Sequence, residues 1–158
     1  MEVRIFVRNI GSGKGKWFDL PVTEDDVRKE LGNPEGDFEY EVEVSEGLSV
    51  EGVNDIDKIN EFVEELENYD SDIVEALIES GYDTIKKLED INIEDCTLYE
   101  GVEDNHDLGK YIIENVYGGI SEVSEQTLEN YFDYEKFGDD VDLEVIGHYC
   151  KKGYIQLP

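Results

Sequence analysis

Acidic residues alternate with apolar residues through the body of this chain, and this pattern limits what the chain can fold into. Residues 30–85 contain 19 acidic residues and one basic residue, and residues 88–135 contain 14 and one. The two ends are nearly balanced, with five acids and six bases in residues 1–29 and four acids and three bases in residues 136–158. Because the acids are interleaved with candidate core positions, we expect a folded scaffold that carries rows of carboxylates, not a disordered acidic tail.

The total charge excludes several classes of partner. The chain has 42 Asp and Glu against 13 Lys and Arg, a formal net charge of −29. Self-repulsion of this size destabilises a compact state, so a basic partner or a salty environment is expected to account for it. Direct binding to nucleic acid is not expected because the phosphates would be repelled. An anionic membrane surface is disfavoured for the same reason.

The sequence also predicts where the protein resides. No stretch approaches the roughly 18 apolar residues that a membrane-spanning helix needs, and the opening MEVRIFVRNI lacks the apolar core and cleavage site of a signal peptide. The two cysteines, Cys96 and Cys150, are too few for a disulfide framework. We therefore expect a cytoplasmic protein with reduced thiols.

Periodicity and capping residues predict an α+β fold. The opening has the period-two pattern of a strand, and Thr23 and Gly32 have the character of a helix N-cap and a helix stop. The end of the chain is expected to form a β-hairpin that turns at residues 151–153. In chain order the expected elements are a strand at 3–7, a turn at 11–16, a strand at 17–21, a helix after Thr23, a turn at 33–36, a strand at 38–44, and helices at 56–66, 71–80, 84–91 (with Asp83 as its cap), 108–116 and 125–132.

Two of these elements are expected to display carboxylates along one face. In the strand, alternation places Phe38, Tyr40, Val42 and Val44 on the inner face and Glu39, Glu41 and Glu43 on the outer face. In the helix, Ile56, Ile59, Phe62, Val63 and Leu66 follow amphipathic spacing, opposed by Glu61, Glu64, Glu65 and Glu67. Carboxylates at these positions would be held at regular spacing on rigid elements.

Motifs for catalysis, metals and phosphate binding are weak. Cys96, His106, His148 and Cys150 have the chemistry of zinc ligands but lack ligand spacing, so isolated packing residues are the favoured interpretation. Residues 138–144 carry oxygen ligands without the spacing of a calcium loop, and GSGKGK leads into a strand, as a hairpin turn does. Because any two of so many carboxylates could be named an acid–base pair, no catalytic residue is assigned. We expect a non-enzymatic protein with no cofactor and no metal.

The size of the charge favours a mimic of DNA. B-form DNA carries about one charge per 1.7 Å of axis, so a net charge of −29 matches about 50 Å of duplex. Two other classes stay open. The chain could be an acidic adaptor for another basic protein, or an acid-surfaced halophilic protein whose charge serves solubility in salt.

Three segments resemble the ArdA antirestriction family, in the expected order along the whole chain. The block LENYFDYEKFGDDVDL at residues 128–143 is similar to the family pattern L-x-N-Y-x-D-Y-x-x-x-G-R-D-x-x-L, with Asp139 where an Arg is usual. WFDLP at residues 17–21 looks like the end of the family's first hairpin, whose turn is shorter here, and KYIIE at residues 110–114 is similar to its central helix.

The resemblance implies an elongated protein of three small modules that imitates bent DNA and competitively blocks Type I restriction–modification enzymes. The modules would be an N-terminal α+β module at 1–53, a central helical acidic module at 54–100 and a C-terminal α+β module at 101–158. It implies no catalytic residue. The carboxylates expected to stand in for phosphates are Glu39, Glu41, Glu43, Glu61, Glu64, Glu65, Glu67, Asp70, Asp72, Glu75 and Glu79.

A homodimer is expected through the C-terminal module. The aromatic residues Tyr131, Phe132, Tyr134 and Phe137 lie beside the least acidic part of the chain. Two bodies of such high charge can meet only where the local charge is low and apolar area is available. The alternative is that these aromatic residues fill the core of their own module.

Overall fold

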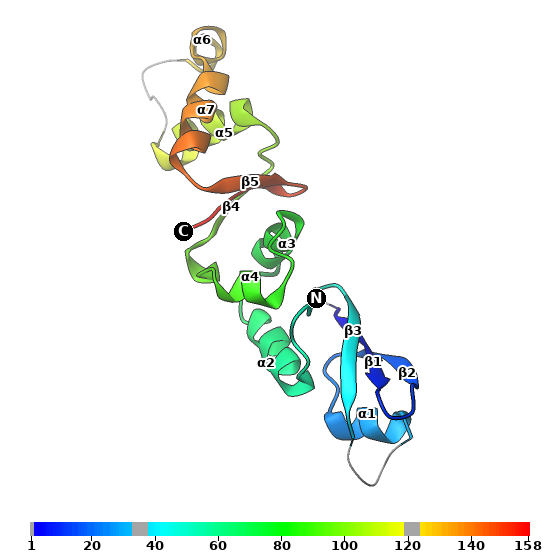
Figure 1. The fold of residues 1–158 in the computed structure, drawn as a ribbon. Helices are drawn as coiled ribbons and strands as arrows, with labels where there is room; N and C mark the ends of the chain where they lie inside the picture. The colour runs from blue at the N-terminus through cyan, green and yellow to red at the C-terminus, as the bar shows by residue number, and fades with distance from the viewer. Residues whose placement is uncertain (1, 33–37, 119–123) are drawn as a thin grey trace. The chain divides into compact units, whose positions relative to one another are not determined.

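The computed structural model describes residues 2–32, 38–118 and 124–158, and it confirms a mixed α+β fold (Figure 1). The chain divides into two compact units. The first unit is formed by Met1–Ser71 and Tyr82–Asp90, and the second by Asp72–Gly81 and Ile91–Pro158. The chain therefore enters the second unit, returns to the first, and enters the second again. The division into three modules stays a prediction.

The first unit contains an antiparallel sheet in the order β2-β1-β3. Its strands are β1 (Arg4–Asn9), β2 (Gly15–Asp19) and β3 (Tyr40–Glu46). Ile5 and Val7 of β1 are fully buried, as the alternating pattern requires. The predicted hairpin of β1 and β2 is confirmed, whereas the predicted turn at 33–36 lies outside the described residues.

Helix α1 (Glu24–Glu30) lies between β2 and β3 in the chain, and its ends are those that the sequence predicts. The Thr23 side chain caps it by accepting a hydrogen bond from the backbone nitrogen of Asp26 at 3.2 Å. Val27 is buried, and Gly32 has a φ of 81°, which permits the chain to leave the helix.

The prediction that Val44 faces inward with Val42 is wrong. The pairing of β1 with β3 shifts register between Phe6 and Val7, so that Phe6 pairs with Val44 and Val7 with Val42. Glu43 is the extra residue of this bulge, and beyond a bulge the side chains change faces. Val44 is consequently 54% exposed.

The remaining helices of the first unit are α2 (Ile56–Leu66) and α4 (Ile85–Glu89). An isolated parallel bridge between Ser49 and Thr84 joins the segment after β3 to the start of α4. Thr84 caps α4, since its side chain accepts from the backbone nitrogen of Lys87 at 3.2 Å. The expected cap, Asp83, is instead bound by the Lys87 ammonium group at 2.8 Å.

The second unit contains a sheet in the order β4-β6-β5. Its predicted hairpin is confirmed as β5 (Gly147–Cys150) and β6 (Gly153–Gln156), while β4 (Thr97–Glu100) pairs on the other side of β6 and was not expected. Helix α3 (Ser71–Glu79) and the 3-10 helix η1 (Ile93–Asp95) precede β4. Tyr154 of β6 is fully buried and donates a hydrogen bond to Asp142 at 2.6 Å.

Four helical segments complete the second unit. They are α5 (Asn105–Tyr111), its π-helical continuation η2 (Ile112–Val116), α6 (Glu125–Tyr131) and α7 (Tyr134–Glu144). The core cluster joins Leu108 and Ile112 to Tyr154 and Val102. Sequence analysis placed helices at α5 and α6 but assigned none at α7. No helix in the described part of the chain is long and apolar enough to cross a membrane.

Candidate partner-binding surface

The carboxylates of α2 lie on the solvent side of an amphipathic helix. Asp55 caps the helix and accepts a hydrogen bond from the backbone nitrogen of Lys58 at 3.2 Å. Ile56, Ile59, Val63 and Leu66 form its buried face. The outward positions carry exposed acids, namely Asp57, Glu61, Glu64 and Glu65, followed by Glu67 at the C-cap. The predicted display of carboxylates on this helix is confirmed.

The charge at the C-terminal end of α2 is not compensated within the described residues. The last turn contains no basic residue, although cations are the side chains that stabilise this end of a helix. Within the described part of the chain, Glu61, Glu64, Glu65 and Glu67 form no ion pair, and Lys58 pairs with Asp55 at 3.8 Å. Like charges at these spacings cost about 0.2–0.5 kcal/mol per pair. The helix therefore loses stability to its own exposed charge.

The carboxylates of β3 are partly compensated. Glu39 and Glu41 are exposed, and neither forms an ion pair within the described residues. Glu43 is different, because the Arg8 guanidinium binds both of its oxygens, one of them at 2.9 Å. The hydrogen bond and charge of Arg8 hold the pKa of Glu43 below its usual value. One of the three carboxylates predicted on this strand is thus already paired with an arginine of the neighbouring strand β1.

The carboxylates of α3 are all paired with lysines of the β5–β6 turn. Lys152 contacts Asp72 and lies 2.9 Å from Glu75. Glu79 accepts from the Lys151 ammonium group at 2.7 Å and from the Lys151 backbone nitrogen at 3.1 Å. Two lysines therefore form ion pairs with three of the eleven predicted phosphate mimics. Asp70, just before α3, is exposed.

The four predicted interface aromatics have different surroundings. Tyr134 is 2% exposed and contacts Phe132 edge to face, so its side chain serves the core of its own unit. Phe137 packs against the core cluster around Leu108, and Phe132 is half-buried. Tyr131 is 86% exposed. Of the four, Tyr131 alone presents most of its ring to solvent.

Among the described residues, the structure brings no three of Cys96, His106, His148 and Cys150 together as a group that could hold a metal ion. Cys96 is buried, which raises the pKa of its thiol, and it donates a hydrogen bond to the carbonyl of Asn92. Its free thiol and that of Cys150 form no disulfide with each other. Around His106 the structure brings together a group that sequence analysis did not foresee, with ligand atoms of Asp104, His106 and Asp107 within 4.8 Å of one another.

The geometry of this group is explained by helix capping. Asp104 is the N-cap of α5 and accepts from the backbone nitrogen of Asp107 at 2.9 Å. Asp107 in turn accepts from the backbone nitrogen of Glu103 at 3.3 Å. The first bond is that of an N-cap, and the second reaches back to the residue before the cap, so hydrogen bonds to the backbone draw the two carboxylates together.

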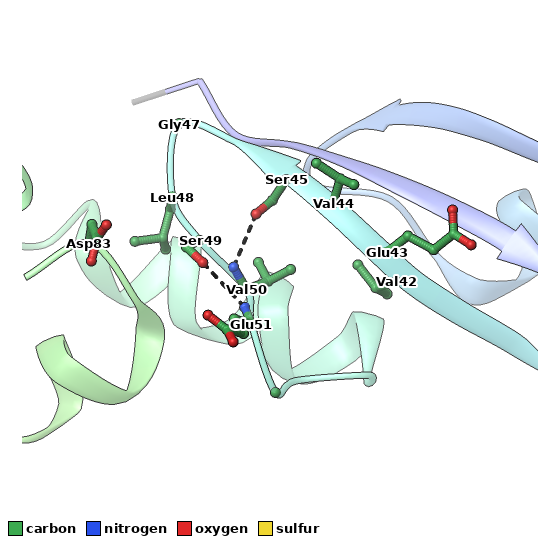
Figure 2. Close-up of a pocket in the computed structure, with 11 residues that line it drawn as sticks. Val42, Glu43, Val44, Ser45, Gly47, Leu48, Ser49, Val50, Glu51 and Asp83 are labelled. Atoms are coloured by element: carbon green, nitrogen blue, oxygen red, sulfur yellow. Dashed lines mark hydrogen bonds between the residues drawn. The ribbon is translucent and has the colours of Figure 1, made fainter.

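A groove of about 590 Å³ lies beside the end of β3 in the first unit (Figure 2). Figure 2 shows that β3, the segment after it and Asp83 form its walls. The Ser45 hydroxyl accepts a hydrogen bond from the Val50 backbone nitrogen at 3.1 Å, which joins β3 to the segment that follows it. Three carboxylates line the groove, but Arg8 engages Glu43 and Lys87 engages Asp83. Glu51, which sequence analysis did not single out, adds a carboxylate to the exposed acidic surface.

Comparison with known proteins places the chain in a family. The model of the family described as Antirestriction protein (ArdA) matches residues 9–156. The chain therefore belongs to the ArdA antirestriction protein family, as its resemblance to that family predicts. Membership implies an antirestriction function and interaction with restriction–modification enzymes. No curated protein matches the chain.

The C-terminal block that carries the resemblance has structural roles. Asp133 caps α7 by accepting from the backbone nitrogen of Lys136 at 3.0 Å, and Tyr134 fills the core. Gly138 is buried where α7 crosses α5, and a Cβ atom there would lie 1.6 Å from the carbonyl oxygen of Asn105. Since no side chain fits at that distance, the glycine is required for the crossing. These residues build the second unit, whereas the carboxylates of α2 belong to the first.

Proposed function

We propose that the protein is a DNA mimic that occupies the DNA-binding groove of Type I restriction–modification enzymes. The observation that carries this proposal is the row of uncompensated carboxylates on α2. A partner with a basic groove would supply cations to the last turn of the helix, which has none of its own. The interaction would resemble phosphate binding, which positions a ligand without reading sequence, so one inhibitor could act on enzymes with different target sites.

The charge density of α2 supports the comparison with DNA. The helix has 11 residues, which corresponds to a length of about 17 Å. One strand of B-form DNA carries about five phosphates over that length. The helix carries four carboxylates, Asp57, Glu61, Glu64 and Glu65. One face of the helix thus approaches the charge that a DNA strand presents to a protein.

We further propose that the protein acts in the cytoplasm as a homodimer joined through its C-terminal third. Tyr131 and Leu143, at 86% and 84% exposure, provide apolar surface there, and Ile146 is also exposed. Burial of such side chains on association is favourable. The protein would bind without turnover, and it would contact no nucleic acid directly.

A competition experiment tests the mechanism. The protein would be titrated into a Type I enzyme, with DNA cleavage as the readout, at several concentrations of DNA. We expect stoichiometric inhibition that excess DNA relieves competitively. Inactivation at substoichiometric amounts, or covalent modification of the target, would overturn the proposal. An acidic adaptor would leave cleavage unaffected, and a halophilic protein would require molar salt to keep its circular dichroism spectrum.

A further inference from the structure

The β5–β6 turn places two lysines against the carboxylate stripe of α3. Asp72, Glu75 and Glu79 lie three and four residues apart, which puts them on one side of the helix. Lys152 contacts Asp72 and Glu75, and Lys151 makes two hydrogen bonds to Glu79. All five residues belong to the second unit. Without the lysines, the three carboxylates would repel one another as those of α2 do.

Each of the two lysines makes two contacts with these carboxylates. The Glu79 side chain is 30% exposed and accepts both a backbone and an ammonium donor from Lys151. These donors lower the pKa of Glu79, and the two carboxylates around Lys152 raise the pKa of its ammonium group. Networks with several donors hold their geometry better than isolated exposed pairs do.

We propose that Lys151 and Lys152 are positioning residues that hold α3 on the β5–β6 turn and withdraw Asp72, Glu75 and Glu79 from the partner-binding surface. The carboxylates of α2 then carry the contact with the basic groove. This inference rests on the proposed function, which it deepens by dividing the predicted phosphate mimics into two groups. One group meets the partner and the other stabilises the protein itself.

The physical reason is the difference in what each group gains from a partner. A carboxylate of α3 must give up a lysine before it can bind a cation of the enzyme, so the exchange replaces one ion pair by another. A carboxylate of α2 has no ion pair within the described residues, and a cation from the enzyme also relieves its repulsion by neighbours. Complementary charge is therefore worth more at α2.

Two triple variants with equal loss of charge test the division. The first is Glu61→Gln, Glu64→Gln and Glu65→Gln in α2, and the second is Asp72→Asn, Glu75→Gln and Glu79→Gln in α3. We expect the α2 variant to weaken inhibition about tenfold and to reduce its salt dependence, since three exposed pairs are lost. The α3 variant should inhibit within about twofold of the natural protein and should unfold at a lower temperature. Equal weakening by the two variants, at equal folded fraction, would overturn the division.

A third variant tests the positioning role without the restriction enzyme. Lys151→Met with Lys152→Met removes both cations, and amide hydrogen exchange measures the opening of α3. We expect exchange in α3 to accelerate at least about tenfold while exchange in α2 stays unchanged. Unchanged exchange in α3 would refute the positioning role, whatever the enzyme assay shows. If exchange accelerates and the natural protein still fails to compete with DNA, it is the proposed function that fails.

Discussion

An exposed carboxylate without an ion pair affects two free energies, that of folding and that of binding. At the scale of single residues, Glu64 of α2 represents this class, since its like-charged neighbours disfavour the helix and a basic partner would favour it. Glu43 represents the opposite class, because Arg8 already engages both of its oxygens. The same residue type thus serves two purposes on one surface.

Neutralising carboxylates singly and together should give different results. We expect Glu64→Gln alone to leave inhibition nearly unchanged, because an exposed ion pair contributes about 0–1 kcal/mol. Adding Glu61→Gln, Glu65→Gln and Glu67→Gln should weaken inhibition progressively and raise the free energy of unfolding, as repulsion is relieved. Inhibition and urea unfolding of the series measure both effects. Loss of all inhibition from one substitution in a folded protein would indicate a hot-spot interface instead.

The Arg8–Glu43 pair should make a pH-dependent contribution to stability. The pKa of Glu43 in the folded protein lies below its ordinary value of 4.5, because the hydrogen bond from Arg8 stabilises the ionised carboxylate. Its contribution is therefore fully present above pH 4.5 and is lost as the pH falls through the folded pKa. We expect Glu43→Gln to lower the free energy of unfolding at pH 7 and to have little effect well below pH 4. Glu39→Gln, which removes an exposed acid with no ion pair in the described structure, is the matched control for urea titrations at both pH values.

At the scale of elements, the crossing of α5 and α7 determines the second unit. A Cβ atom at Gly109 would lie 2.2 Å from the carbonyl oxygen of Tyr134, and one at Gly138 would approach Asn105 still more closely. The two glycines allow the helix backbones to touch. Tyr134 and Leu108 then fill the space beside the crossing.

A methyl group at this crossing should destabilise the second unit. We expect Gly138→Ala to lower the free energy of unfolding by about 1–3 kcal/mol, because the helices must separate to admit it. Asp140→Ala, an exposed position on the same helix, should change stability by no more than about 0.5 kcal/mol. Thermal unfolding of the two variants makes the comparison. Equal stability of Gly138→Ala and the natural protein would contradict the close approach.

At the scale of the whole molecule, a net charge of −29 opposes folding through the sum of many weak repulsions. Raising the salt concentration from 0.01 M to 0.15 M shortens the Debye length from about 30 Å to about 8 Å. We expect the melting temperature to rise by about 2–4 °C for each kcal/mol of repulsion that is screened. The same change in salt weakens the ion pairs of Lys151 and Lys152. A melting temperature that falls with salt would therefore mean that the attraction within ion pairs outweighs the repulsion among the carboxylates.

The proposed homodimer also belongs to this scale. Sedimentation at physiological salt should show a species of twice the 18.1 kDa chain at tens of micromolar. Replacing Tyr131 and Leu143 by Ser should shift the equilibrium toward the single chain, because these two side chains provide exposed apolar surface. Only an 18.1 kDa species for the natural protein at this concentration would count against the dimer.

Local patterns in the sequence were sufficient for much of the fold. Alternation predicted β1 and the last hairpin, and helical spacing with Thr23 as a cap predicted α1 and α2. These features depend on a few neighbouring residues, whose conformations are coupled by short-range sterics and hydrogen bonds. The charge distribution and the C-terminal block also predicted the family from the sequence alone. The exposed row on α2 follows from the same periodicity.

Contacts between distant residues decided the rest. The block at 128–143 contains a glycine and several acids, so its composition concealed α7, which the crossing with α5 stabilises. The bulge that exposes Val44 depends on how β1 and β3 pair. Likewise, the pairing of Glu79 with Lys151 joins residues 72 positions apart. The sequence by itself therefore determined that this protein displays a surface of carboxylates. Only the tertiary structure decided which of these carboxylates have no cation beside them, because a long-range ion pair exists only after the chain has folded.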